Sequence, residues 1–477
     1  MRLQLGGGAA LAALVLGTAL PAAAATATPN DPLFVQGDQW GLSGAAASIN
    51  APQAWPVSTG AGVLVADVDT GANFGHPDLA GKLVAGARFT HDNCTNQNAP
   101  YAPSATGQSA VTDDVDHGSM TTGLMVADTN NGTGIAAVAP SAWALIIKVL
   151  SATRDINGNV TGSGCDNDVA AGIYWAADHG AQVINLSIGS DVPGLGLSTT
   201  SEIPAAVRYA AGHGVAVALA AGNGAGTPAG NAGLPASDYI QLEGIALVVG
   251  ALAPDDTVPG YSNSLAGVNV YAPGGDSTEG NDVHHLVIST GLGSSYIAEQ
   301  GTSFAAPHVA GTLALLMSCG LTGAQARQRI LDTRRGGTDL DAAAAVSGVG
   351  HCAAAATPTA APGVTPGQTA RPATAPPATA PPGAAPGGAP VRVRPGGPPI
   401  AAASQSPGAV APAPGSPGPS AGVDAASAGG GGAAPGAVAA GGSGGHLGAV
   451  LAGIGGAVAI LIAAVVAGPL RSWRRPL

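Results

Sequence analysis

Short apolar runs alternate with amphipathic stretches through the first two thirds of the chain. The apolar runs are rich in β-branched residues and lie at Val63–Val68, Ala144–Leu150, Val183–Ser187, Val215–Ala221 and Ile245–Gly250. Stretches with helical spacing of apolar residues lie between several of them, such as Asp168–His179 and Ile203–His213. Apolar strands that alternate with helices are typical of a parallel sheet covered on both faces. The pattern therefore predicts an α/β domain.

The first 25 residues have the pattern of a secretory signal peptide. Arg2 gives a basic start, Leu11–Leu20 an apolar segment, and Ala22–Ala24 a cleavage site of small residues. The alternative is an uncleaved anchor, although the apolar segment is too short to span a bilayer. We therefore expect an exported domain that begins at residue 26.

Residues 353–445 have the composition of a linker. They contain 19 prolines, only four charged residues and no aromatic residue. Such a segment cannot bury enough apolar surface to offset the entropy of ordering it. We predict a disordered linker rich in Pro, Ala and Gly, long enough to hold the domain away from a membrane surface.

A single transmembrane helix is predicted at 446–469. The run Leu447–Gly468 contains 22 uncharged residues, which is enough to cross the hydrocarbon layer. Arg471, Arg474 and Arg475 follow it and mark a short cytoplasmic tail at 470–477. The alternative is a buried helix of a soluble domain, but no further core is available to bury it. The domain at 26–352 is therefore expected on the extracytoplasmic side of the cell membrane.

Charge argues against a nucleic-acid partner. The net charge is −12, and residues 30–352 hold 27 acidic residues against nine basic ones. Aromatic residues make up only 3% of the chain, which leaves few side chains on which bases could stack.

Three polar residues are candidates for an active site, which in such sheets lies near the carboxyl ends of the strands. Asp69 follows the first predicted strand. His117 precedes the helical run Met120–Ala127, and Ser303 precedes the apolar helix Val309–Met317. The free N–H groups at the start of that helix would favour negative charge developing near Ser303.

The motifs around these residues resemble those of the subtilisin family of serine proteases. The matching segments are Val65–Gly71 with His76–Leu79, His117–Ser119 with Gly132–Pro140, and Gly301–Gly311. The order Asp, His, Ser is also the family's. The resemblance implies a subtilisin-like three-layer fold over 26–352 and hydrolysis of peptide bonds through an acyl-enzyme intermediate, with no required cofactor.

The resemblance assigns a role to each residue. His117 would take the proton of the Ser303 hydroxyl and later give it to the leaving amine, while Asp69 would hold the imidazole in the useful tautomer. Asn223 lies in a segment that resembles the family's A-A-G-N motif and would donate to the oxyanion.

Each of these residues also has an ordinary structural interpretation. Asp69 alone could form a turn, His117 alone could lie in a solvated loop, and a G-T-S tripeptide occurs by chance. Their occurrence together in the family's order favours catalysis. The alternative function is a catalytically idle subtilase domain that acts as a binding or scaffold module at the cell surface.

A polypeptide substrate is expected to bind as an added β-strand. Ser187, Ile188 and Gly189 resemble the family's segment on one side of the cleft, and the loop Ser151–Cys165 would form the other side. The alternative for Leu186 and Ile188 is packing in the core.

The sequence departs from the family's pattern at several positions. Asp67 replaces an apolar strand residue and should point to the same face as Asp69, where it would perturb the electrostatics or fill a polar pocket. Met120 replaces a second histidine, and Phe304 and Ala306 are a variant seen in mycosins. The stretch before residue 50 is too short for the prodomain of many secreted members.

The order of signal, protease domain, Pro-rich linker and terminal helix is also similar to that of mycosins, which accompany type VII secretion. This similarity implies a secretion apparatus as a partner. The cysteine-bearing N-terminal extension usual in mycosins is not evident in the sequence.

The four cysteines lie in the predicted exported domain, where disulfides are stable. Of the three pairings, Cys94–Cys165 and Cys319–Cys352 are favoured. No spacing suggests zinc. Asp78 and the loop containing Asn130 resemble a structural calcium site of the family, and an ordinary turn at the end of a helix is the alternative.

Overall fold

The fold is described by a computed structural model, which covers residues 28–90, 102–154, 158–188, 202–225, 242, 244–264, 267–278, 282–350, 352, 391–393 and 401–402. The chain divides into two units, 1–409 and 410–477, and the second lies wholly outside these residues. The predicted signal peptide, transmembrane helix and basic tail lie outside them as well. Within the described ranges, no helix combines the length and apolar character that a membrane span needs.

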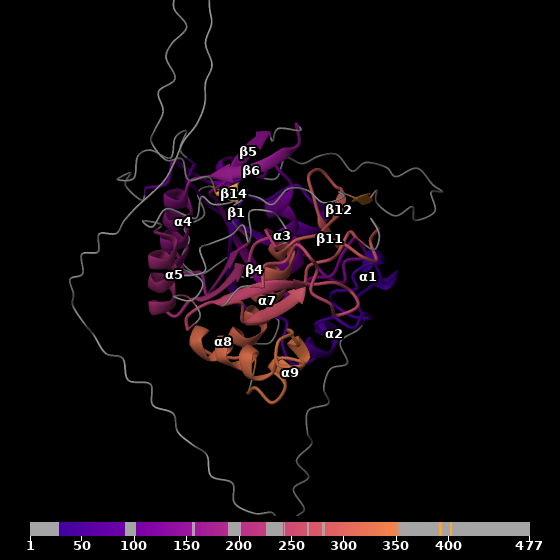
Figure 1. The fold of residues 1–477 in the computed structure, drawn as a ribbon. Coiled ribbons are helices and arrows are strands. Elements are labelled where there is room, and N and C mark those ends of the chain that lie inside the picture. The colour runs from indigo at the N-terminus through magenta and orange to yellow at the C-terminus, as the bar shows by residue number, and fades with distance from the viewer. Residues whose placement is uncertain are drawn as a thin grey trace, which may run out of the picture. The chain divides into compact units, whose positions relative to one another are not determined.

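An eight-stranded, mainly parallel sheet forms the centre of the domain (Figure 1), in the order β10-β9-β8-β7-β1-β4-β2-β3. Only the pair β2 and β3 is antiparallel. The strands are β1 Leu64–Asp69, β2 Leu83–Arg88, β3 Ala105–Thr106, β4 Trp143–Lys148, β7 Val183–Leu186, β8 Ala216–Ala220, β9 Leu247–Leu252 and β10 Val270–Pro273. All five predicted strands are present close to their expected bounds, and the α/β prediction is confirmed.

Helices cover both faces of this sheet. Helices α4 (Asp166–Asp178) and α5 (Ile203–Gly212) pack against each other on one face. Helices α3 (His117–Val126) and α7 (Thr302–Met317) pack against each other on the opposite face. The other helical segments are α1 Pro32–Val35, α2 Ala51–Ala54, η1 Pro77–Leu79, η2 Gln108–Ala110, α8 Gly323–Asp332 and α9 Ala342–Val346. The expected three layers follow from this arrangement.

Strand β1 is buried on both faces, and its alternation positions the site. Leu64, Ala66 and Val68 pack in the core beneath α4 and α5, whereas Val65 packs in the core beneath α7. Because side chains alternate along a strand, Asp67 and Asp69 share the face of Val65. The sequence thus places two buried carboxyl groups under the layer formed by α3 and α7.

Two short strands come from the segment predicted to be a linker. Val391–Val393 (β13) pairs in parallel with β12 (Tyr296–Glu299), which itself pairs with β11 (Val287–Thr290). Ala401–Ala402 (β14) pairs in parallel with β6 (Val160–Gly164), which forms a hairpin with β5 (Ser151–Arg154). The linker prediction missed this pairing because adding an edge strand requires backbone hydrogen bonds and no apolar side chains. The rest of 353–445 lies outside the described residues.

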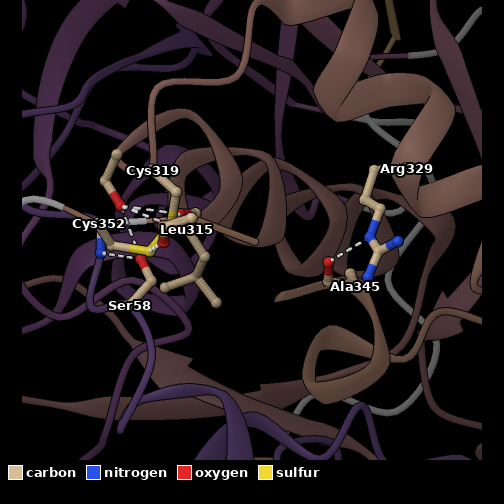
Figure 2. Close-up of a disulfide and its surroundings, with 9 residues drawn as sticks. Ser58, Leu315, Cys319, Arg329, Ala345 and Cys352 are labelled. Carbon is tan, nitrogen blue, oxygen red and sulfur yellow. Dashed lines mark hydrogen bonds between the residues drawn. A yellow bond between two sulfur atoms is a disulfide. The ribbon is translucent and has the colours of Figure 1, made fainter. Parts of the chain in front are cut away.

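A disulfide joins the end of α7 to the end of the domain. Cys319 and Cys352 are bonded with an S–S distance of 1.98 Å (Figure 2), which confirms that predicted pair. Beside the bond, the Ser58 hydroxyl donates to the carbonyl of Leu315 at 2.7 Å. Cys165 is also disulfide-bonded. Its predicted partner, Cys94, lies outside the described residues, so that pairing stays a prediction.

Candidate active site

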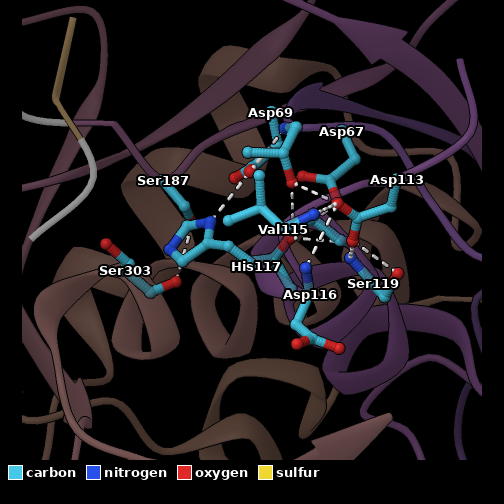
Figure 3. Close-up of polar contacts among 12 residues, drawn as sticks. Asp67, Asp69, Asp113, Val115, Asp116, His117, Ser119, Ser187 and Ser303 are labelled. Carbon is cyan, nitrogen blue, oxygen red and sulfur yellow. Dashed lines mark hydrogen bonds and ion pairs between the residues drawn. The ribbon is translucent and has the colours of Figure 1, made fainter. Parts of the chain in front are cut away.

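The last residue of β1 and the first residue of α3 form a buried hydrogen-bonded pair, which becomes an ion pair when the imidazole is protonated. The Nδ1 atom of His117 lies 2.8 Å from Oδ1 of Asp69 (Figure 3), and the two residues are 7% and 1% exposed. Burial of the ring opposes its protonated form. The charge of Asp69 and its hydrogen bond outweigh burial, so the pKa of His117 lies above its ordinary value. The structure therefore brings these two sequence-predicted residues together.

Close backbone contacts fix the start of α3. A Cβ atom at Gly118 would lie 2.1 Å from the carbonyl oxygen of Gly71, so only glycine fits after His117. Asp116 adopts a φ of 94°, which side-chain-bearing residues seldom adopt. Its Oδ1 accepts a hydrogen bond of 2.6 Å from the backbone N–H of Leu292, which helps to hold this conformation. The backbone geometry therefore requires glycine at position 118, while the predicted chemistry requires histidine at position 117.

Asp113 connects the loop after β1 to the first turn of α3. Its buried carboxyl group accepts hydrogen bonds from the Thr70 hydroxyl at 2.8 Å and from the Ser119 hydroxyl at 2.6 Å. The backbone N–H groups of Val115 and Ser119 also donate to it, each at 2.9 Å. Burial raises the pKa of Asp113. Sequence reasoning missed this residue, and the run of acidic residues just before His117 was the available signal.

Ser303 lies in the first turn of α7, next to the ring of His117. Figure 3 shows the imidazole between Asp69 and Ser303. The following residue, Phe304, packs its ring against that of His117 with centroids 5.5 Å apart. Ser303 is 7% exposed, and its carbonyl accepts a hydrogen bond of 2.7 Å from the Ser187 hydroxyl. Ser303 stands at a helix start, where backbone N–H groups have no partner within the helix, and those of the neighbouring Thr302 and Phe304 donate to Asn223 and to the carbonyl of Gly301.

Asn223 follows β8 and lies against the start of α7. Its Oδ1 accepts hydrogen bonds from the backbone N–H and the hydroxyl of Thr302, both at 2.9 Å. The Thr302 hydroxyl in turn accepts from the N–H of Gly222 at 3.0 Å. Because the oxygen side of the amide is fixed in this way, Nδ2 is the side available to donate. The arrangement suits the predicted role of Asn223.

The predicted substrate segment after β7 has buried side chains. Ser187 is fully buried, and its hydroxyl accepts from Asn185 and donates to Ser303. Leu186 and Ile188 pack in the core, as the alternative interpretation held. Gly189 lies outside the described residues. Substrate contact through this segment therefore stays a prediction, and it would use backbone groups.

Asp67 lies in a polar pocket beneath the site. Its carboxyl group is 1% exposed and accepts hydrogen bonds from the hydroxyls of Thr121 and Thr122 and from the side-chain amide of Asn185, at 2.8, 2.6 and 2.9 Å. Burial, with a further contribution from the charge of Asp69, raises the pKa of Asp67 to about 7. The predicted polar pocket is thus present.

The predicted calcium residues belong to one loop region with two buried acids. Asp78 is fully buried, and its oxygens accept from the Asn131 side chain, the Ile135 N–H and the Tyr296 hydroxyl. Asn130 donates its backbone N–H to Asp31, a second buried acid that sequence reasoning missed.

The two buried acids of this region supply part of the oxygen ligand set that a hard cation needs. Burial is the main cause that raises the pKa values of both Asp31 and Asp78, and the charge of Asp78 adds to the effect on Asp31. A divalent cation between two such groups would stabilise their ionised forms. Among the described residues no cluster of three or more His, Cys, Asp or Glu side chains could hold a metal ion. Further calcium ligands would therefore be amide and backbone oxygens.

The chain resembles known proteases over most of the described domain. The model of the Subtilase family, Peptidase S8, matches residues 60–353. Thermitase from Thermoactinomyces vulgaris is 37% identical over 306 residues, which are 64% of this chain and 91% of thermitase. The thermophilic serine proteinase of Bacillus sp. (strain AK1) is 36% identical over 307 residues, 64% of each protein. A solved protease from Pseudoalteromonas arctica PAMC 21717 is 30% identical with a TM-score of 0.56, covering 68% of this chain and 99% of that one.

Proposed function

The chain belongs to the subtilase family of serine proteases, and on that premise we propose that it is an exported, membrane-tethered endopeptidase that acts through Asp69, His117 and Ser303. The observation that carries the proposal is the buried pair of His117 and Asp69, 2.8 Å apart, with the start of α7 packed against the imidazole. A histidine held by a carboxylate and facing a serine at a helix start is the arrangement that activates a hydroxyl.

The geometry supports a two-step hydrolysis. The Ser303 oxygen attacks the peptide carbonyl carbon while Nε2 of His117 takes the hydroxyl proton, and Asp69 stabilises the imidazolium. Nδ2 of Asn223 and the backbone N–H of Ser303 donate to the oxyanion of the tetrahedral intermediate. When this intermediate collapses, the C–N bond breaks, His117 protonates the leaving amine, and an acyl-enzyme remains. Water then adds to the acyl group with His117 as the base, and the acid product and Ser303 are released.

The proposed substrate is an extended polypeptide. The cleft would lie between the backbone after Ser187 and the hairpin of β5 and β6. Main-chain pairing of this kind gives affinity for many sequences, while pockets for side chains give preference among them.

The proposed location rests on the segments predicted before and after the protease domain. A signal peptide at 1–25, a linker at 353–445 and a transmembrane helix at 446–469 would hold the protease domain on the extracytoplasmic side of the cell membrane. The disulfide between Cys319 and Cys352 agrees with an oxidising compartment. Cleavage of the domain from intact cells by an added protease would support this topology, and a protected domain would overturn it. A secretion apparatus as a partner is part of the same proposal.

A structural calcium ion is proposed at Asp31 and Asp78. When bound, the ion would neutralise two buried carboxylates and hold the loop after α3 against η1. It would take no part in the chemistry at Ser303.

Labelling with a fluorophosphonate separates catalysis from the scaffold alternative. The full chain in detergent should react covalently, and Ser303→Ala should not. A folded wild-type protein that fails to label would favour a catalytically idle module and would contradict the proposed triad.

A further inference from the structure

A buried acid on β1 contacts the element that carries His117. One carboxyl oxygen of Asp67 accepts hydrogen bonds from Thr121 at 2.8 Å and from Thr122 at 2.6 Å. Both threonines are fully buried and lie about one turn after His117 in α3. Because both hydroxyls belong to α3 and share one oxygen of Asp67, they restrain the rotation of α3 about its axis and its distance from the sheet. The position of the imidazole therefore depends on Asp67.

The other carboxyl oxygen connects to Ser303 through two side chains. Asn185 on β7 lies directly opposite Asp67 in the sheet, and its Nδ2 donates to Asp67 at 2.9 Å and to the Ser187 hydroxyl at 3.0 Å. The Ser187 hydroxyl donates to the carbonyl of Ser303 at 2.7 Å. Because a hydroxyl has one proton, Ser187 must accept from Asn185 while it donates to Ser303. Asn185 is thus the donor in both of these contacts, and the series ends on two acceptors, the Asp67 carboxyl group and the Ser303 carbonyl.

The third element is β1 itself, which carries Asp69 two residues after Asp67 on the same face. We propose that Asp67 is a positioning residue for peptide-bond hydrolysis, which holds the elements of Asp69, His117 and Ser303 in one arrangement. The proposal rests on the proposed function in naming those three residues as the triad. An apolar residue at position 67 would leave three buried donors, on Thr121, Thr122 and Asn185, with one acceptor fewer, which is costly at this depth.

The charge of Asp67 adds an electrostatic effect to this positioning. Asp67 is one of the groups that raise the pKa of His117, after Asp69 and Glu299. Other titratable side chains on or beside the surrounding elements include Lys148 on β4, His308 on α7, Asp78 on η1, Asp166 and Asp168 on α4, and Asp113, Asp114 and Asp116 before α3. Lys148 donates to the Asp114 carboxylate at 2.7 Å, and burial lowers the pKa of His308 to about 4, which leaves that ring neutral at pH 7. Removal of the Asp67 charge should therefore lower the pKa of His117.

The variant Asp67→Asn tests both effects with little change in volume. Its amide oxygen can accept from the threonines, but its NH₂ group then faces the NH₂ group of Asn185. We expect kcat of the full chain on a peptide substrate to fall about tenfold with KM nearly unchanged, since the substrate does not touch residue 67. The acid limb of kcat/KM should move to lower pH. The control Asp341→Asn, which lies at the start of α9 and can still cap that helix, should change neither quantity.

A second measurement does not depend on turnover. In the Ser303→Ala background, NMR titration of the His117 ring should give a lower pKa with Asp67→Asn than without it. If the protein neither labels nor cleaves peptides, the proposed function fails, and this titration still tests the coupling. An unchanged kcat together with an unchanged His117 titration in folded Asp67→Asn would overturn the inference. A loss of kcat that matches a loss of folded protein, with the titration unmoved, would overturn it too.

Discussion

The side-chain oxygen of Asn223 accepts two hydrogen bonds from Thr302, one from the backbone N–H and one from the hydroxyl, each 2.9 Å long. Thr302 is the first residue of α7 and immediately precedes Ser303. The same residue therefore starts the helix of the proposed nucleophile and leaves the NH₂ group of Asn223 as the side that would donate to an oxyanion. In the proposed mechanism, the donor and the nucleophile are thus positioned by one turn of the chain.

Replacement of Asn223 by Ala should lower kcat by about 10²–10³, because a donor to the oxyanion is lost while substrate contacts remain. This magnitude is the one known for removing the donor from subtilisin, a member of the same family. Thr302→Val keeps the backbone N–H and removes only the hydroxyl, so it should cost kcat far less. Steady-state kinetics on one peptide ester would check the order. Asn223→Ala with kcat within threefold of the wild type would remove Asn223 from the mechanism.

The pH dependence of kcat/KM should follow the raised pKa of His117. The imidazole must be neutral to take the Ser303 proton, so activity should rise as pH increases through a value above 6.5, the ordinary pKa of histidine. The contribution of the ion pair with Asp69 to stability has the opposite trend. It is fully present below pH 6.5 and is lost as pH rises through the raised pKa of the folded state. Asp69→Asn should move the acid limb to lower pH, and an unshifted limb would contradict this origin of the pKa.

Much of the candidate site could be predicted because each proposed catalytic residue lies in a local motif. Asp69 ends an apolar strand, while His117 and Ser303 start helices, and such placements can be read from a few neighbouring residues. The supporting contacts are different. Asp67 meets Asn185 because β1 lies beside β7, although 118 residues separate them, and the order of strands in a sheet does not follow from the pattern of any one strand. The pairing of β13 with β12 was missed because an added edge strand needs no apolar side chains and so leaves no pattern in the sequence.

Asp113→Asn should destabilise the fold by about 1–3 kcal/mol, because buried donors from Thr70 and Ser119 lose a charged acceptor. It should also lower kcat, since those contacts join the loop of Asp69 to the helix of His117. Urea unfolding and steady-state kinetics on the same preparation would measure the two effects. Gln325→Ala removes part of an exposed helix cap and provides a comparison variant that loses stability without a loss of kcat. A wild-type kcat in Asp113→Asn would show that Asp113 serves the fold alone.

Removal of the disulfide by Cys319→Ser with Cys352→Ser should lower the free energy of unfolding by about 3–4 kcal/mol, because the bond closes a loop between residues 33 positions apart. Since neither cysteine contacts His117 or Asp69, kcat at low temperature should stay near that of the wild type. Denaturant unfolding under oxidising conditions would give the difference. Equal stability of the double variant and the wild type would contradict a stabilising role for this bond.

Chelation should lower the melting temperature if calcium binds at Asp31 and Asp78. Both acids are buried and have raised pKa values, so an ion that neutralises them would stabilise only the folded state. We expect EGTA to lower the melting temperature of the wild type, calcium to restore it, and magnesium to restore it poorly, because magnesium demands a tighter octahedral site. Asp78→Asn should melt at a lower temperature and respond little to either treatment. If EGTA leaves the melting temperature of the wild type unchanged, the two acids are held by their amide and hydroxyl donors alone and calcium has no part in this loop.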